Sequence, residues 1–160
     1  MGNPAKLIET LKRNQWIVQA QTAGLSHPDS LLQLPFRGNC LNWVLGHLAL
    51  HRDKMLVLTG RESLLDEGEY EPYRRGSAPI LSGEGAVRLE ALLGALALLA
   101  ERLEAGLERC SPGALAEVID EKHGFTLGDR LEFLLWHETY HLGQLEYLRQ
   151  LAGKDDAVIE

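Results

Sequence analysis

Four of the six histidines fall into two pairs, His47 with His51 and His137 with His141, and the members of each pair are four residues apart. Side chains at this spacing lie on the same side of an α-helix, one turn apart. Apolar residues recur around both pairs at the helical period, so we expect the imidazoles to face the interior. Buried imidazoles need polar partners, which a leucine-rich interior rarely offers. A shared metal ion would supply one.

A three-histidine metal site is the chemistry that this spacing favours. Neutral imidazole binds Zn²⁺ at roughly 2.0–2.1 Å, and three protein ligands leave a coordination position for water or a substrate, as in catalytic sites. One helix can place two nitrogens on the ion and a facing helix the third; zinc and nickel both accept such a set. The alternative is that each histidine is an individually hydrogen-bonded core residue. His27 and His123, beside Pro28 and Gly124, are expected to be exposed.

Residues 137–141 also spell H-E-x-x-H, the motif of zinc proteases in which two histidines bind the metal and the glutamate is a general base. Two features argue against a protease. Gln144 and Tyr147 stand where the longer form of the motif needs glycine and histidine. Only residues 142–160 follow the motif, most of them still helical in pattern, to supply a distant third ligand. The protease interpretation is therefore weak.

Four segments that carry these residues show apolar positions at the helical period, and almost none alternates as a half-buried strand does. The expected helices span about residues 4–23, 39–59, 82–110 and 126–152, with capping residues such as Asn3 and Thr126 before them and glycines such as Gly24 and Gly153 after them. Four helices of this length predict an all-α, four-helix bundle. The whole chain, residues 1–160, is long enough for one domain with its own core.

Two connections, residues 25–38 and 61–81, are longer than the links of about 2–8 residues that usually join neighbouring helices of a bundle. They favour a crossover topology. The second connection contains Tyr70 and Tyr73. It could rim a pocket, or it could be a strap whose tyrosines cover the edge of the bundle.

Composition excludes some classes of function. Lys and Arg number 16 against 23 Asp and Glu, a formal net charge of −7, so a nucleic-acid partner bound through a basic surface is not expected. The longest apolar run, residues 91–100, is too short to cross a bilayer, which needs about 20 such residues, and no apolar signal core follows Met1. We expect a cytoplasmic protein without a membrane partner. Cys40 and Cys110 are expected to be buried free thiols, and Trp43, Phe133 and Trp136 to pack in the core.

Two motifs resemble those of the DinB/YfiT-like superfamily. One is N-W-V-L-G-H-L at residues 42–48, and the other is T-L-G at 126–128 leading into L-W-H-E-T-Y-H-L-G-Q at 135–144. The order of elements is similar over most of the chain. The resemblance implies a four-helix bundle of up-down-down-up topology that is often a homodimer. It also implies that His47, His137 and His141 bind a divalent metal.

The resemblance extends to activity. Characterised members include S-transferases that use bacillithiol, mycothiol or glutathione, a maleylpyruvate isomerase and proteins described as metal-dependent hydrolases. A three-histidine metal can lower the pKa of a bound thiol or water and present the anion to an electrophile. The implied partners are a small-molecule substrate and a low-molecular-weight thiol. Two alternatives stay open: a non-catalytic module that binds a metal or a small ligand, for example in a stress response, and a dimerising bundle whose histidines are core residues.

Four further residues are candidates for the site. Glu138 could act as a base or orient an imidazole, or it could be a surface carboxylate. His51 could be a fourth ligand, a proton carrier or, as we favour, a polar residue at the mouth of a pocket. Gln144 and Arg130 flank the metal on the same helix and are the candidate contacts of a cofactor. Arg130 could pair with a carboxylate of the thiol, or it could be solvent-exposed.

Overall fold

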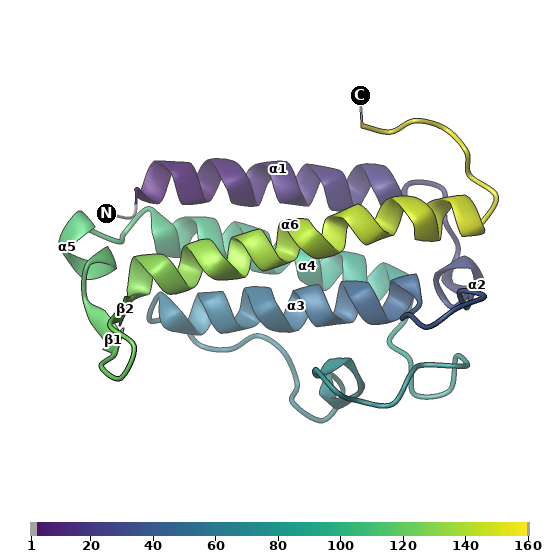
Figure 1. Cartoon of the computed structure of the whole chain (residues 1–160), viewed down its shortest axis with the longest axis horizontal. Coiled ribbons are helices and arrows are strands. Elements are labelled where there is room, and N and C mark those ends of the chain that lie inside the picture. The colour runs from purple at the N-terminus through teal and green to yellow at the C-terminus, as the bar shows by residue number, and fades with distance from the viewer. Residues whose placement is uncertain (1–2, 160) are drawn as a thin grey trace.

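Four long helices make up most of the protein in the computed structural model, which describes residues 3–159 (Figure 1). They are α1 (Pro4–Thr22), α3 (Leu41–Leu58), α4 (Leu89–Leu107) and α6 (Leu127–Leu151). Helices α1 and α3 each contact both α4 and α6, so every long helix has two long neighbours and the four enclose a common interior. The predominantly helical architecture predicted from the apolar period is confirmed.

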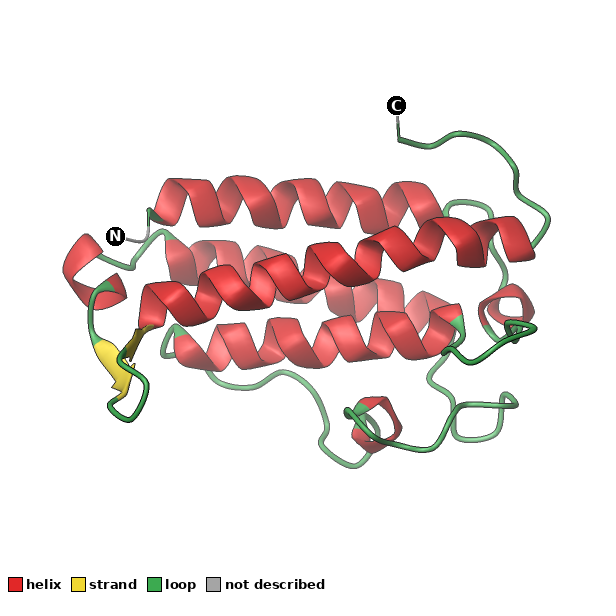
Figure 2. Ribbon diagram, in the orientation of Figure 1, coloured by secondary structure: helices red, strands yellow, loops and turns green. Residues whose placement is uncertain are grey.

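The connections contain short elements that the sequence pattern did not predict (Figure 2). They are the helix α2 (His27–Ser30), the 3-10 turn η1 (Glu71–Tyr73), the helix α5 (Pro112–Leu115) and the strands β1 (Val118–Asp120) and β2 (Phe125–Thr126). The two strands pair in an antiparallel hairpin between α5 and α6. Strands this short cannot display the alternation that marks a strand in a sequence.

The predicted caps form at both ends of α1 and α6 and at the end of α3, where Gly24, Gly153 and Gly60 take a positive φ just past the helices. The side chain of Asn3 accepts a hydrogen bond from the Ala5 backbone N–H at 3.0 Å. At the start of α6, Thr126 and Asp129 bond reciprocally to each other's backbone N–H groups at 3.1 and 2.9 Å, so the capping box is complete. Gly153, just beyond α6, has a positive φ of 78°, which suits a residue without a Cβ.

Helix α4 begins at Leu89, seven residues later than the predicted start near Ser82. Gly85 has a φ of 73°, which no α-helix contains, so residues 82–88 form turns instead. The freed N–H of Leu89 donates to Nδ1 of His27 at 3.1 Å. His27 is buried by this contact, which corrects the expectation that it is exposed. His123 is exposed, as expected.

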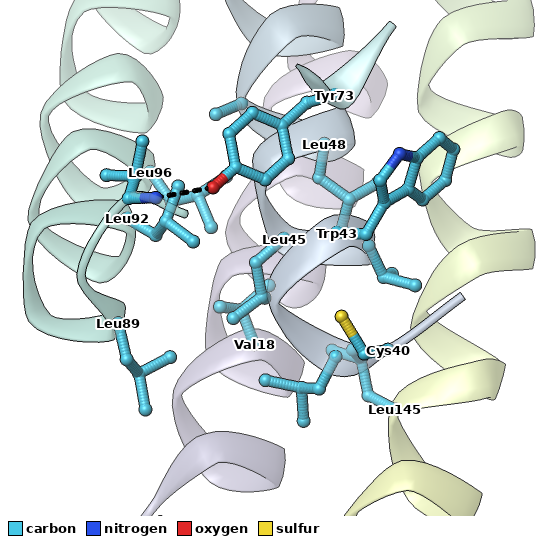
Figure 3. Close-up of a cluster of buried hydrophobic side chains, with 14 of the residues drawn as sticks. Val18, Cys40, Trp43, Leu45, Leu48, Tyr73, Leu89, Leu92, Leu96 and Leu145 are labelled. Carbon is cyan, nitrogen blue, oxygen red and sulfur yellow. Dashed lines mark hydrogen bonds between the residues drawn. The ribbon is translucent and has the colours of Figure 1, made fainter. Parts of the chain in front are cut away.

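Leucines fill the interior, and Figure 3 shows the cluster in which Leu45 and Leu48 of α3 pack with Leu92 and Leu96 of α4. A second cluster continues toward the other end of the bundle, between the start of α1 and the start of α6. Cys40 is buried in the first cluster and Cys110 is only half-buried, so the expectation of two buried thiols holds for one of them. Both thiols are free.

The connection between α3 and α4, residues 59–88, is fastened to α3 by buried side chains. The Tyr73 hydroxyl accepts from the Val87 N–H at 2.7 Å, the dashed line in Figure 3. It also donates to Oδ1 of Asn42 at 2.9 Å. A Cβ added to Gly46 would overlap the Tyr73 ring, so the glycine lets this ring lie directly on the helix. The indole N–H of Trp43 donates to the Pro72 carbonyl at 3.1 Å. The tyrosines thus cover the edge of the bundle, and Arg74 and Arg75 of the same connection line a pocket, so both predictions for this segment hold.

Helix α6 turns aromatic side chains to solvent. Trp136 is 61% exposed and Phe133 is 48% exposed, which corrects the prediction that both pack in the core, whereas Trp43 is buried as predicted. The reason is that α6 packs through Leu134, Leu135 and Leu142, and positions 133 and 136 fall outside that arc. None of the helices in residues 3–159 has a stretch long and apolar enough to cross a membrane.

Candidate metal centre

Three histidines converge between α3 and α6. The ligand nitrogens of His47, His137 and His141 all lie within 4.8 Å of one another. The two Nε2 atoms of His137 and His141 are 3.2 Å apart. Two nitrogens that each lie roughly 2.0–2.1 Å from one tetrahedral zinc ion are separated by roughly 3.3 Å. The pair on α6 therefore has the spacing that a shared ion requires, and His47 supplies a third nitrogen from the facing helix.

Hydrogen bonds prepare two of the three rings for binding through Nε2. Nδ1 of His47 lies 2.8 Å from the Tyr73 carbonyl oxygen, which can only accept, so Nδ1 carries the proton and Nε2 keeps its lone pair. Nδ1 of His141 lies 2.8 Å from Oε1 of Gln144, which gives His141 the same tautomer. Metal-binding histidines in proteins are oriented in this way by a second hydrogen bond. Gln144, predicted as a cofactor contact, is the hydrogen-bond partner of His141.

The surroundings of the histidines keep them uncharged. Burial lowers the pKa of His47 and His141 below the usual value. Burial also lowers the pKa of His137 to about 4 and that of His51 to about 3, and the neighbouring imidazoles add to both effects. Because only the neutral imidazole has a lone pair to give, the cluster is ready to bind a metal at neutral pH.

His51 lies beside the three converging histidines. Its ring centroid is 4.5 Å from that of His47 and 4.4 Å from that of His137. It lines the larger pocket next to the cluster, which agrees with the favoured position at a pocket mouth. The Nδ1 atoms of His51 and His137 are buried and have no hydrogen-bond partner among residues 3–159. Polar atoms left in this state mark a place where a ligand, an ion or a water molecule completes the site.

Two pockets reach the cluster. The larger, of about 770 Å³, includes His47, His51 and His137 in its wall, and the remaining lining residues are Leu50, Lys54, Arg74, Arg75, Arg130, Phe133 and Leu134. The smaller, of about 310 Å³, includes Trp43, His141 and Gln144 and is otherwise lined by residues 34, 36–39, 147 and 148. His47 lies under the stacked indole of Trp43, with the ring centroids 4.6 Å apart.

Arg130 lines the larger pocket, and its role as a cofactor contact stays a prediction. Three other cations of this pocket were not predicted from the sequence as site residues. Lys54 follows His47 by seven residues and His51 by three, so its place on the same helix face could have been read from spacing. Arg74 and Arg75 belong to the α3–α4 connection, which carries no periodic pattern. Only the fold, through the buried Tyr73 beside them, brings them to the pocket.

The environment of Glu138 does not suit any of the roles that the sequence suggested. Its carboxylate is fully buried, so the surface alternative is wrong. Both of its oxygens accept from Nε of Arg52, at 3.2 and 3.3 Å. Arg52 also donates to the Leu96 carbonyl at 2.8 Å and to Oε1 of Gln15. With its lone pairs committed to a guanidinium, the carboxylate is poorly placed to act as a base or to orient an imidazole.

Known proteins are similar to this chain in sequence and in fold. The sequence profile of the DinB superfamily matches residues 5–145. Among solved structures, the conserved protein of a locus from Enterococcus faecalis matches with a TM-score of 0.75 and 21% sequence identity, over 96% of this chain and 99% of that chain. At this identity the likeness concerns the fold. No curated protein matches the chain.

Proposed function

The chain belongs to the DinB superfamily, and from this premise we propose that it is a metal-dependent enzyme that transfers a low-molecular-weight thiol to a small electrophile. His47, His137 and His141 would hold the divalent ion, zinc or nickel. One observation carries the proposal: three ligand nitrogens lie within 4.8 Å of one another, from two helices. Imidazoles this close, one of them buried and the other two half-buried, fit an ion better than they fit one another, and two of them already have Nδ1 engaged.

The bound ion would supply a Lewis acid that lowers the pKa of a thiol or of water. The protein's own residues hold and shield that centre. The Tyr73 carbonyl and Gln144 fix the rings of two ligands. The indole of Trp43 covers one face of His47 and keeps water from that side.

Two features favour thiol transfer over hydrolysis. A transfer reaction needs room for a donor and an acceptor, and two pockets meet at the histidines. Hydrolysis needs a base to activate water. No carboxylate lines either pocket in the part of the chain that the structure describes, so His51 would have to serve as that base. Glu138, the candidate base, is paired with Arg52. Metal-dependent hydrolysis is thus the second form of the proposal.

The proposal includes the topology of the superfamily. In Figure 1, α1 and α6 begin at the end of the molecule that holds α5, and α3 and α4 begin at the opposite end. These directions support an up-down-down-up bundle. In such a bundle α3 and α6 are antiparallel neighbours, which lets the two histidine pairs oppose each other.

The first test is the metal content of untagged protein. Wild type is compared with His137→Ala and with His123→Ala, which removes an exposed histidine outside the site. We expect near-stoichiometric zinc or nickel in the wild type and in the His123 variant, and little metal in the His137 variant. Equal metal in all three proteins would show that the assigned ligands are wrong.

The second test is turnover. Metal-loaded protein is screened with low-molecular-weight thiols against small electrophiles, and we expect product that disappears on chelation. Thermal stabilisation by a thiol without product would instead identify a binding module, the alternative that a metal site by itself also allows.

A further inference from the structure

The larger pocket beside the histidines has an unusual charge. Lys54, Arg74, Arg75 and Arg130 line it, and no Asp or Glu does so among residues 3–159, although the chain as a whole carries a formal charge of −7. The four cations come from three separate parts of the fold: α3, the α3–α4 connection and α6. Their convergence is therefore a product of tertiary structure and not of one basic stretch of sequence.

Three of these cations have no counter-charge. Arg74 is neutralised by Glu67 at 2.5 Å and by Glu71 at 2.8 Å. Lys54, Arg75 and Arg130 form no ion pair and no side-chain hydrogen bond within the described residues 3–159. The Arg130 guanidinium lies 5.5 Å from the centre of the Phe133 ring, a contact that positions the group without using its N–H donors.

The unpaired cations lie close enough to the histidines to act on them. The positive charges of Arg130 and Arg75 contribute to the lowered pKa of His137, and that of Lys54 contributes to the lowered pKa of His51. Like charges gathered at one concave site repel one another and raise the local potential. A negative group of a ligand would relieve this repulsion and would receive several charge-assisted hydrogen bonds.

We propose that this pocket binds a small organic anion whose carboxylate or phosphate group is held by Lys54, Arg75 and Arg130. The cavity of about 770 Å³ is large enough for such a molecule. With the anionic group held there, the rest of the ligand reaches His47 and His137, which share the same wall. That the ligand is the substrate or the thiol rests on the proposed function, whereas the anion site itself does not need the metal.

The test measures binding of succinate and of inorganic phosphate to metal-free protein by calorimetry at low ionic strength. The variant K54Q/R75Q/R130Q removes the three unpaired cations. The control R61Q/R102Q/R109Q makes the same change in net charge at a different pocket, which Glu62 also lines. We expect the first variant to bind the better probe at least tenfold more weakly than the wild type. The control should bind within twofold of the wild type.

The outcomes identify the chemical class of the ligand and distinguish a failure of the anion site from a failure of the proposed function. Preference for succinate identifies a carboxylate ligand and preference for phosphate a phosphate ligand. No binding to the wild type, or equal loss in both triple variants, overturns the anion site. Zinc content is measured in the same proteins before the metal is removed, and K54Q/R75Q/R130Q should retain as much zinc as the wild type. Absence of metal from the wild type would contradict the proposed function but would leave the anion-binding result valid. If the triple variant does not fold, K54Q/R75Q, both exposed positions, must still weaken binding.

Discussion

Helices α3 and α6 are joined by two polar clusters, the Arg52–Glu138 pair and the four histidines. The polar atoms of the first cluster are hydrogen-bonded within the protein, whereas some of those in the second are not. Arg52 is bonded to α6 through Glu138, to α1 through Gln15 and to α4 through the Leu96 carbonyl, so one guanidinium ties all four long helices together. Both side chains are sealed from solvent. The histidine cluster opens to two pockets, and two of its buried nitrogens have no hydrogen-bond partner within residues 3–159.

The difference separates a structural polar group from a functional one. A buried polar network that is satisfied within the protein holds the fold in one arrangement. A cluster that keeps unsatisfied polar atoms needs another explanation, and the proposed metal ion and ligand would supply one here. Proximity to a motif is a poorer guide, because Glu138 lies inside H-E-x-x-H and belongs to the first class.

The largest effect should come from breaking the sealed pair. Arg52→Met leaves the Glu138 carboxylate buried without a counter-charge, and such changes cost about 3–5 kcal/mol of unfolding free energy. Urea denaturation of metal-free protein measures the loss. The double variant R52M/E138L should recover most of it, and Arg102→Met, at an exposed position of α4, should cost little. A mild loss in R52M would show that the two clusters do not differ as described.

The next largest effect concerns the open cluster. Gln144→Ala removes the acceptor that orients His141, and loss of such a partner usually weakens metal affinity by about 10–100-fold. A zinc titration against a competing chelator measures the change. Gln150→Ala, on an exposed face of the same helix, is the matched control. Unchanged affinity in Gln144→Ala would remove Gln144 from the site.

A pH series sharpens the comparison further. In metal-free native protein the pKa of His137 is about 4 and that of His51 about 3, whereas an unfolded histidine titrates near 6.5. The unfolded chain therefore binds more protons in this interval, so the unfolding free energy falls as the pH is lowered from about 6.5 toward about 4. His51→Leu should flatten the slope in urea denaturation between pH 7 and pH 5. An unaltered slope would mean that the native protein does not hold His51 in a buried, uncharged state.

The smallest effect is expected on the solvent side of α6. Trp136 is 61% exposed, and Trp136→Gln should change the unfolding free energy by less than about 0.5 kcal/mol. Trp43→Phe, which removes the donor to Pro72 in a buried position, should cost more. Thermal denaturation of both variants checks this order, and a reversed order would restore Trp136 to the core.

Local signals allowed much of the molecule to be predicted. The apolar period, Asn3 and the Thr126–Asp129 box located α1 and α6 to within a residue or two. The four-residue spacing and the resemblance together selected the three histidines that converge. Arg52 carries no such signal, since its partner Glu138 is 86 residues away in sequence. The α4 start was missed because Gly85 takes a positive φ that ends the helical pattern, and because the first N–H of the helix bonds to His27, far upstream.

The contact between Gly46 and Tyr73 constrains how these two positions can change during evolution. The ring of Tyr73 occupies the space that a side chain at position 46 would fill, and its backbone carbonyl fixes the adjacent His47. A change at either position alone would therefore disturb the backbone that holds the His47 ring. Descendants of this sequence should keep the two residues as a pair or exchange them together. Position 73 should therefore change as slowly as the helix it covers, although it lies in a connection between helices.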